Sequence, residues 1–196
     1  MFKLVNQKEI KTVIEKSKFF SFSYNCYSTE QLNKILKEVR KKNQSATHVC
    51  YACIIHEDND VLCYSSDDRE PSGTAGLQIL QALKENNMIN TLCVVVRYFG
   101  GLKLGVAGLG RAYKESALAT VKDNKKEVNL KNLYKINCDY NQFNIIKTFF
   151  SKNNIDFFEE SFENNISFCV YLTDFEVNSI QGYTLAIEDK KVKQYC

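Results

Sequence analysis

Short runs of apolar residues, separated by polar turns, divide the first two thirds of the chain into extended and helical segments. The extended segments are rich in β-branched and aromatic residues, a composition typical of strands. We place them at residues 12–27, 48–55, 61–66 and 92–96. The second and third flank the turn-forming sequence EDND and are predicted to form a hairpin. The last, with no internal polar break, is typical of a strand buried on both faces of a sheet.

Helices are predicted where apolar residues recur at three- and four-residue spacing. Ser28 can cap the first helix, and Gln31 can bond back to the first turn. The second helix follows the turn at residues 71–76 and stops at Asn86 or Asn87. The apolar faces are Leu32, Ile35, Leu36 and Val39 in the first helix, Leu77, Leu80 and Leu83 in the second, and Tyr113, Ala117, Leu118 and Val121 in a third.

The last third of the chain repeats this alternation on a smaller scale. Its segments are extended at 133–140, helical at 143–150, extended at 155–162 and 166–172, weakly helical at 175–186 and extended at 192–195. The order βαββαβ predicts a ferredoxin-like domain, with Asn164 and Asn165 forming a two-residue hairpin turn. The fold class is therefore α+β, with domains at 1–124 and 132–196 joined by a polar linker at 125–131.

Charge divides the chain in the same way as the pattern. The 196 residues carry a net charge of +3, but residues 1–131 hold 20 Lys and Arg against 14 Asp and Glu, whereas residues 132–196 hold 6 against 9. A polyanion is therefore expected to meet the first domain. There is no membrane-spanning apolar stretch and no signal-peptide core, so we expect a cytoplasmic protein.

Eight cysteines lie scattered in this chain, most of them within apolar segments. Without a secretion signal they are expected to be reduced and buried. Cys50 and Cys53 are three residues apart in an extended segment, so their side chains point to opposite faces and cannot easily share a metal ion.

The most distinctive segment is the glycine-rich loop at residues 97–113, RYFGGLKLGVAGLGRAY. Glycines allow close approach of the backbone to a ligand, and the N–H groups of a helix start attract anions. Arg97 is expected to mark the point where the buried strand surfaces. The predicted site for phosphate or a nucleic-acid backbone comprises Arg97, Gly100, Gly101, Lys103, Gly105, Gly108 and Arg111. The alternative is a glycine-rich connection whose cations are merely solvated.

A second informative segment, the acidic turn at residues 66–76, carries Asp67, Asp68 and Glu70 before a helix. These carboxylates can favour the positive helix end and pair with Arg97 or Arg69, or they can hold Mg²⁺ beside a phosphate. His48 is a weak candidate for a base or phosphate ligand, with a structural role as the alternative. Ser72 and Thr74 are interpreted as caps rather than nucleophiles.

Four segments together resemble the IMPACT/YigZ family: SKFFS at 17–21, ATHVCYA at 46–52, SDDREPSGTAG at 66–76 and VVVRYFGGLKLGVAGLGRAY at 94–113. The chain is similar to bacterial members with a small C-terminal domain. The resemblance implies a first domain like domain 2 of ribosomal protein S5, a four-stranded sheet with helices on one face. It also implies a second domain like the last domain of translocating elongation factors, and a role in regulating translation.

Two positions depart from the family pattern. Arg69 stands where the family usually has glycine in the acidic turn, and Ala107 replaces a glycine of the loop. An alanine needs an ordinary φ, so not every glycine of the loop is required for ligand approach.

The sequence is compatible with three functions. The first is a non-enzymatic regulator that binds RNA, a ribosomal complex or a translation-factor partner through the basic loop, without a cofactor. The second is a metal-dependent enzyme acting on a phosphorylated small molecule or nucleotide, with Mg²⁺ held by the acidic turn. The third is a protein-interaction module without an anion site. No recognisable catalytic constellation favours the enzyme.

Overall fold

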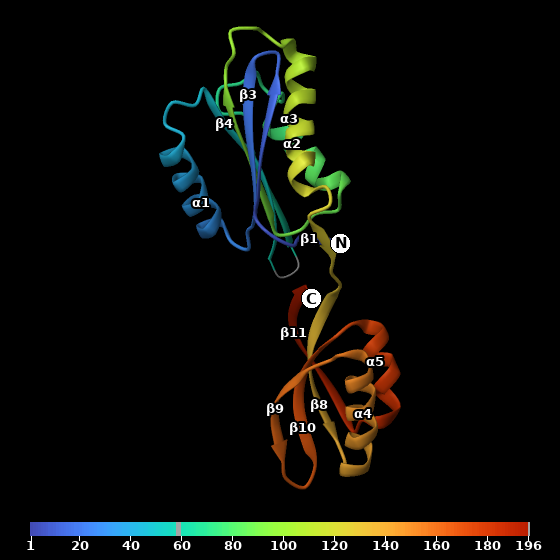
Figure 1. Cartoon of the computed structure of the whole chain (residues 1–196). Coiled ribbons are helices and arrows are strands. Elements are labelled where there is room, and N and C mark those ends of the chain that lie inside the picture. Colours follow the sequence, from blue (N-terminus) through green and yellow to red (C-terminus); the bar gives the residue numbers. More distant parts are fainter. Residues whose placement is uncertain (58–59, 196) are drawn as a thin grey trace. The chain divides into compact units, whose positions relative to one another are not determined.

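The computed structural model describes residues 1–57 and 60–195. The chain forms two compact units, Met1–Glu127 and Val128–Cys196 (Figure 1). No helix in the described ranges is long and apolar enough to cross a bilayer.

The first unit is built on an antiparallel sheet with the strand order β2-β3-β6-β4-β5. Its strands are β2 (Lys8–Ile14), β3 (Ser17–Asn25), β6 (Thr91–Tyr98), β4 (His48–Glu57) and β5 (Asp60–Ser66). The sheet is five-stranded, not four-stranded, because the segment predicted at 12–27 divides into two strands. Glu15 and Lys16, both at positive φ, turn the chain between them. The predicted hairpin of β4 and β5 is confirmed, while residues 58 and 59 of its EDND turn lie outside the described residues.

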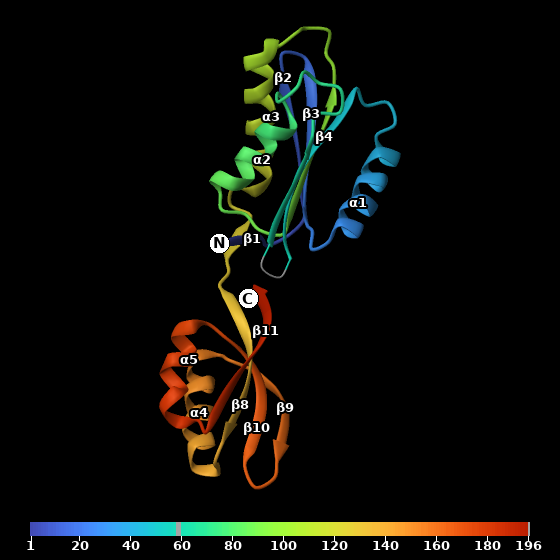
Figure 2. The same ribbon diagram turned by 180° about the vertical axis from the view of Figure 1, so that it is seen from behind.

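Helices cover both faces of this sheet rather than one (Figures 1 and 2). The helices are α1 (Thr29–Lys42), α2 (Gly76–Glu85) and α3 (Gly105–Val121). One core lies between the sheet and α2 and α3, and a separate core lies beneath α1. Cys50 belongs to the first core and Cys53 to the second, which confirms that they point to opposite faces. β6 is buried throughout except at its last residue, as expected for a strand covered on both sides.

Two helices differ in detail from their predictions. Ser28 caps α1 as expected, but the Gln31 side chain accepts from the N–H of Tyr27 rather than from that of Ser28. In α2 the buried face is rotated, since Leu77 is 55% exposed while Ile79 is fully buried. The first turn of α2 is held by contacts with the acidic turn, and these override the apolar periodicity.

Part of the predicted linker is structured. β7 (Lys125–Glu127) pairs antiparallel with β1 (Phe2–Leu4). Leu4 is buried in the core beneath α2 and α3, and the Asn124 carbonyl accepts from the N–H of Val5. Burial of the N-terminal apolar residues therefore ties this part of the linker to the first unit.

The second unit has the predicted order of strands and helices. It contains β8 (Leu130–Cys138), α4 (Tyr140–Asn153), β9 (Phe157–Phe162), β10 (Ile166–Leu172), α5 (Asp174–Ile180), a 3-10 helix (Gln181–Tyr183) and β11 (Ala186–Tyr195). The antiparallel sheet has the order β11-β8-β10-β9, and one core joins it to α4 and α5.

Two details of the second unit were predicted wrongly. Phe162 pairs with Ile166, so the hairpin loop has three residues, Glu163 to Asn165, instead of two. The last helix ends at Ile180, well before the predicted residue 186. Neither Asn164 nor Asn165 has the positive φ that a tight two-residue turn requires.

All cysteines of the described part are free. Cys63, on the edge strand β5, is exposed, and the others are buried.

Candidate functional site

The glycine-rich loop and the acidic turn meet at one end of the first unit, where β6 and β5 end and β3 and β4 begin. The register pairs Arg97 with His48 and Tyr98 with Lys18. α2 and α3 both start at this end. The acidic turn and the glycine-rich loop therefore lie at the same end of the strands (Figure 1). We call this region the loop end.

Arg97 does not surface at the end of its strand. It is only 4% exposed, and its Nη1 donates to Oε1 of Glu70 at 2.6 Å. Its Nη2 donates to Oγ of Ser17 at 3.3 Å, and its guanidinium lies 5.6 Å and 5.4 Å from the rings of Phe19 and Phe99. The charge of Arg97 is therefore neutralised inside the protein, and Arg97 does not join Lys103 and Arg111 in one exposed cation cluster.

Glu70 is the centre of a buried polar network. Besides Arg97, its Oε1 accepts from the Tyr113 hydroxyl at 2.9 Å, and Nε2 of His48 lies 3.6 Å away. The Tyr113 hydroxyl also accepts a weak bond from the Cys50 thiol. A buried carboxylate must be paired to avoid a large desolvation cost, and these donors supply that pairing. The network thus joins β4, β6, α3 and the acidic turn.

A backbone carbonyl group of the acidic turn holds the His48 ring in place. Its Nδ1 lies 2.8 Å from the carbonyl oxygen of Asp68, which can only accept, so Nδ1 carries a proton. The nearby Cys50 is no activated nucleophile, because burial raises the pKa of its thiol to about 12. These contacts match the structural interpretation of His48.

Asp67 organises the start of α2. Its carboxylate accepts from the backbone N–H groups of Gly73, Ala75 and Gly76 at 2.8 to 2.9 Å. Burial opposes ionisation of Asp67, but the three donors outweigh it and lower the pKa of the carboxyl. The prediction that Ser72 and Thr74 cap this helix is wrong: the helix has no cap from its own N-cap side chain, and the Thr74 hydroxyl donates to the Pro71 carbonyl.

Asp68 has a third set of partners. Its Oδ2 accepts from the N–H of Val49 at 2.7 Å, and its Oδ1 lies 3.8 Å from Arg40 and 4.0 Å from Arg69. The three carboxylates of the acidic turn therefore have separate donors. Across the described residues, no group of three or more His, Cys, Asp and Glu side chains is placed to hold a metal ion.

The glycines of the loop have unequal roles. A Cβ at Gly100 would overlap the carbonyl group of Lys16, whereas Gly101 and Gly105 adopt positive φ with open space around them. Gly108 and Gly110 lie inside α3, so the prediction that they form the loop is wrong. Position 100 therefore requires a glycine because the backbone of the turn between β2 and β3 approaches it closely, and not because a ligand does.

The two departures from the family pattern have different consequences. Arg69 has a φ of 70°, a left-handed conformation that explains why glycine is the usual residue there. Ala107 lies in the first turn of α3, where an ordinary helical φ suffices.

Lys103 and Arg111 are the exposed cations of the predicted anion site. The N-terminus of α3 has no side-chain cap and no acidic residue in its first turn. A shallow pocket of about 280 Å³ separates the starts of α2 and α3, with Arg111, Ser72 and Thr74 in its lining. The loop end therefore presents positive charge outside and a neutral network inside.

Tyr113 and Ser17 belong to the network but were not recognised as such from the sequence. Tyr113 was predicted only as an apolar residue of a helix face, and Ser17 was part of a strand. A tyrosine on a buried face needs a partner for its hydroxyl, and that requirement is the signal that could have identified Tyr113.

Known proteins resemble this chain over most of its length. Residues 15–121 match the family model of the Impact N-terminal domain. The IMPACT family member YvyE of Bacillus subtilis is 32% identical over 184 residues, which cover 93% of this chain and 84% of that protein. The IMPACT family member YigZ of Escherichia coli is 33% identical over 134 residues, 66% of this chain and 64% of that protein.

A solved structure, described as the crystal structure of a hypothetical protein, shares the fold with a TM-score of 0.64. It is 24% identical and covers 92% of this chain and 89% of its own. With the family model matched over more than half of the sequence, the chain belongs to the IMPACT family.

Proposed function

We propose that this protein is a translation-associated regulator that binds RNA, free or within a ribosomal complex, through the loop end of its first unit. Membership of the IMPACT family supports the link to translation. The binding proposal is supported by the charge contrast at this end, where the carboxylates of the acidic turn are occupied and the exposed cations outnumber the exposed carboxylate of Glu15. No catalysed reaction is part of the proposal.

The charge contrast carries the argument. The carboxylates of Asp67, Asp68 and Glu70 are bound by backbone donors or by Arg40 and Arg97. Exposed cations at the same end include Lys16, Lys18, Arg69, Lys103 and Arg111. Neither Lys103 nor Arg111 has an ion-pair partner within 4.0 Å in the described part of the chain. Together with the uncapped start of α3, this surface suits phosphate groups.

A fluorescently labelled single-stranded RNA, titrated with the intact protein at low salt, tests this proposal. We expect the double variant Lys103→Ala, Arg111→Ala to bind more weakly than the parent. The matched control is Lys84→Ala, Lys122→Ala, which removes two exposed cations at the C-terminal ends of α2 and α3. Undetectable binding by the parent, or equal loss in both double variants, would contradict the proposal.

A protein partner such as a translation factor is the second candidate, because the loop end also exposes apolar side chains. Phe99 is 46% exposed, Leu102 45% and Val106 68%. This candidate predicts that Leu102→Ser with Val106→Ser abolishes association with intact ribosomes, while Lys103→Ala with Arg111→Ala preserves it. The opposite pattern supports RNA binding.

We also infer that the second unit is a ferredoxin-like domain. Its βαββαβ order and its antiparallel sheet with the order β11-β8-β10-β9 support this assignment. The five-stranded sheet of the first unit, covered on both faces, gives no corresponding support for a likeness to ribosomal protein S5.

A further inference from the structure

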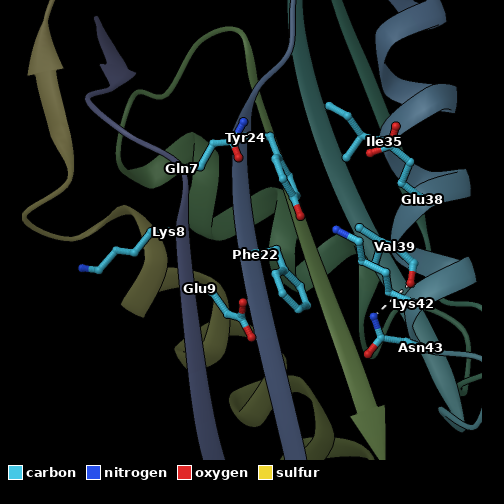
Figure 3. A pocket seen from close by; sticks show the side chains of 10 residues that line it. All are labelled: Gln7, Lys8, Glu9, Phe22, Tyr24, Ile35, Glu38, Val39, Lys42 and Asn43. Carbon is cyan, nitrogen blue, oxygen red and sulfur yellow. Dashed lines mark hydrogen bonds between the residues drawn. The ribbon is translucent and has the colours of Figure 1, made fainter.

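A pocket of about 570 Å³ lies between β3 and α1, and none of its lining residues belongs to the glycine-rich loop or the acidic turn (Figure 3). It exists because α1 packs over the part of the sheet formed by β4 and β6. The buried residues Leu32, Leu36 and Val39 of α1 share a core with Val94 and Val96 of β6. The side chains of β3 on the same face are left half-covered. The volume lies within the range of roughly 300 to 1,000 Å³ that is usual for small-molecule sites.

The two sides of the pocket suit a flat ligand. Phe22 and Tyr24 are alternate residues of β3, so both rings stand on the face toward α1, and both are half-buried. Ile35 and Val39 of α1 lie across from them (Figure 3). A planar ring between these sides would stack on aromatic side chains and contact aliphatic side chains on its other face.

Charged side chains also line this pocket, and they do not form ion pairs with one another. Within the described residues, none of Lys42, Glu38 and Glu9 forms an ion pair within 4.0 Å. Figure 3 shows the Lys42 ammonium group pointing across the pocket toward Tyr24. Lys8 is turned away, and its Nζ lies 3.4 Å from the carbonyl oxygen of Lys122.

Both carboxylates act on the phenol of Tyr24. Burial raises the pKa of Tyr24 first, and the negative charges of Glu9 and Glu38 raise it further. The pocket therefore combines an aromatic floor, a free ammonium group and two free carboxylates. The ammonium group suits a phosphate, and carboxylates accept hydrogen bonds from the exocyclic amines of nucleobases.

We propose that this pocket binds a nucleobase, with Phe22 and Tyr24 stacking on the ring and Lys42 contacting the attached phosphate. The source is a free mononucleotide or an unstacked base of single-stranded RNA. The RNA source rests on the proposed function, whereas the mononucleotide source does not. Glu38 and Glu9 favour adenine, guanine and cytosine over uracil, which lacks an exocyclic amine.

The test uses the full chain and two kinds of probe. Titration calorimetry measures binding of AMP, GMP, CMP and UMP, and fluorescence anisotropy measures binding of labelled 12-nucleotide RNA. The variants are Phe22→Leu with Tyr24→Leu, which keeps apolar bulk without aromatic rings, and Lys42→Ala, which removes an exposed ammonium group at the end of α1. Tyr27→Leu, which removes a half-exposed aromatic ring outside the pocket, is the matched control.

We expect the leucine variant to weaken binding about fivefold or more, the lower end of base stacking on aromatic side chains. Lys42→Ala should weaken it too, and Tyr27→Leu should leave it unchanged. Binding of mononucleotides identifies the free nucleotide as the source, and binding of RNA alone identifies the RNA base. The proposal is overturned if no mononucleotide binds and RNA binding is equal in the parent, the leucine variant and Lys42→Ala. RNA binding that then still depends on Lys103 and Arg111 leaves the proposed function intact.

Discussion

Nη1 of Arg97 lies 2.6 Å from Oε1 of Glu70, and both side chains are almost completely buried. This ion pair joins β6 to the acidic turn, two segments that are 27 residues apart in the sequence. The residue predicted to bind an external anion is thus bound to an internal one. The other two cations of the predicted anion site, Lys103 and Arg111, are exposed and stand outside this network.

Removing one partner of the pair leaves an uncompensated buried charge. We expect Arg97→Ala to lower the free energy of unfolding by about 3–5 kcal/mol. Urea unfolding followed by far-ultraviolet circular dichroism measures this, since the chain has no tryptophan. Lys114→Ala, which breaks the more exposed pair with Glu85, is the control and should have a much smaller effect. Equal losses in the two variants would show that the Arg97 pair contributes no more than a surface pair.

The contribution of Asp67 to the free energy of unfolding depends on pH. Its lowered pKa means that the stabilisation is complete above the unfolded-state pKa of about 3.9 and is lost as the pH falls through the folded-state value. Asp67→Asn should therefore lower the free energy of unfolding by about 1 kcal/mol at neutral pH, in the range of helix caps. Unfolding at pH 7 and at pH 3 should show a smaller difference between variant and parent at the lower pH. A difference that is the same at both values would mean that the ionised carboxylate is not the stabilising form.

Gly100 and Gly110 should respond to alanine in opposite directions. A Cβ at Gly100 overlaps the backbone of Lys16, so we expect Gly100→Ala to destabilise the protein by about 1–3 kcal/mol. Gly110 is helical and its nearest neighbour, the Gln78 side chain, would lie 3.6 Å from the new Cβ. Gly110→Ala should stabilise the protein by up to about 1 kcal/mol through helix propensity. A lower midpoint of thermal unfolding in both variants would contradict the predicted difference between the two glycines.

Arg69 occupies a backbone conformation that favours glycine. Arg69→Gly should stabilise the protein by up to about 1 kcal/mol through relief of the left-handed strain. Arg69→Ala removes the same charge but keeps the Cβ, so it should give no such gain. If both variants behave alike in urea unfolding, the side-chain charge rather than the backbone determines the effect.

The sequence predicted the elements well because their periodicities are local. The alternation in β4 and the three- and four-residue spacing in α1 each follow from one segment, and both elements are present. Which faces of the sheet the helices cover depends on packing between segments far apart in the chain. That information is absent from any single window, so the second covered face was missed.

The candidate site shows the same limit. The residues of the glycine-rich loop and the acidic turn were found from composition, but their contacts were not. Arg97 follows an apolar run, and nothing local distinguishes a cation that surfaces from one that pairs with a distant Glu70. From the sequence, an ion pair between Arg97 and Glu70 was only one of several possible pairings for the carboxylates of the acidic turn.

The salt dependence of RNA binding tests the central claim most directly. Affinity for single-stranded RNA falls with salt concentration with a slope of about −0.7 for each phosphate neutralised, on logarithmic axes. The account predicts a steep slope for the parent protein and a slope smaller by about 1.4 for Lys103→Ala with Arg111→Ala, with no change for Lys84→Ala with Lys122→Ala. A slope that is identical in the parent and in the Lys103 and Arg111 double variant would contradict the account.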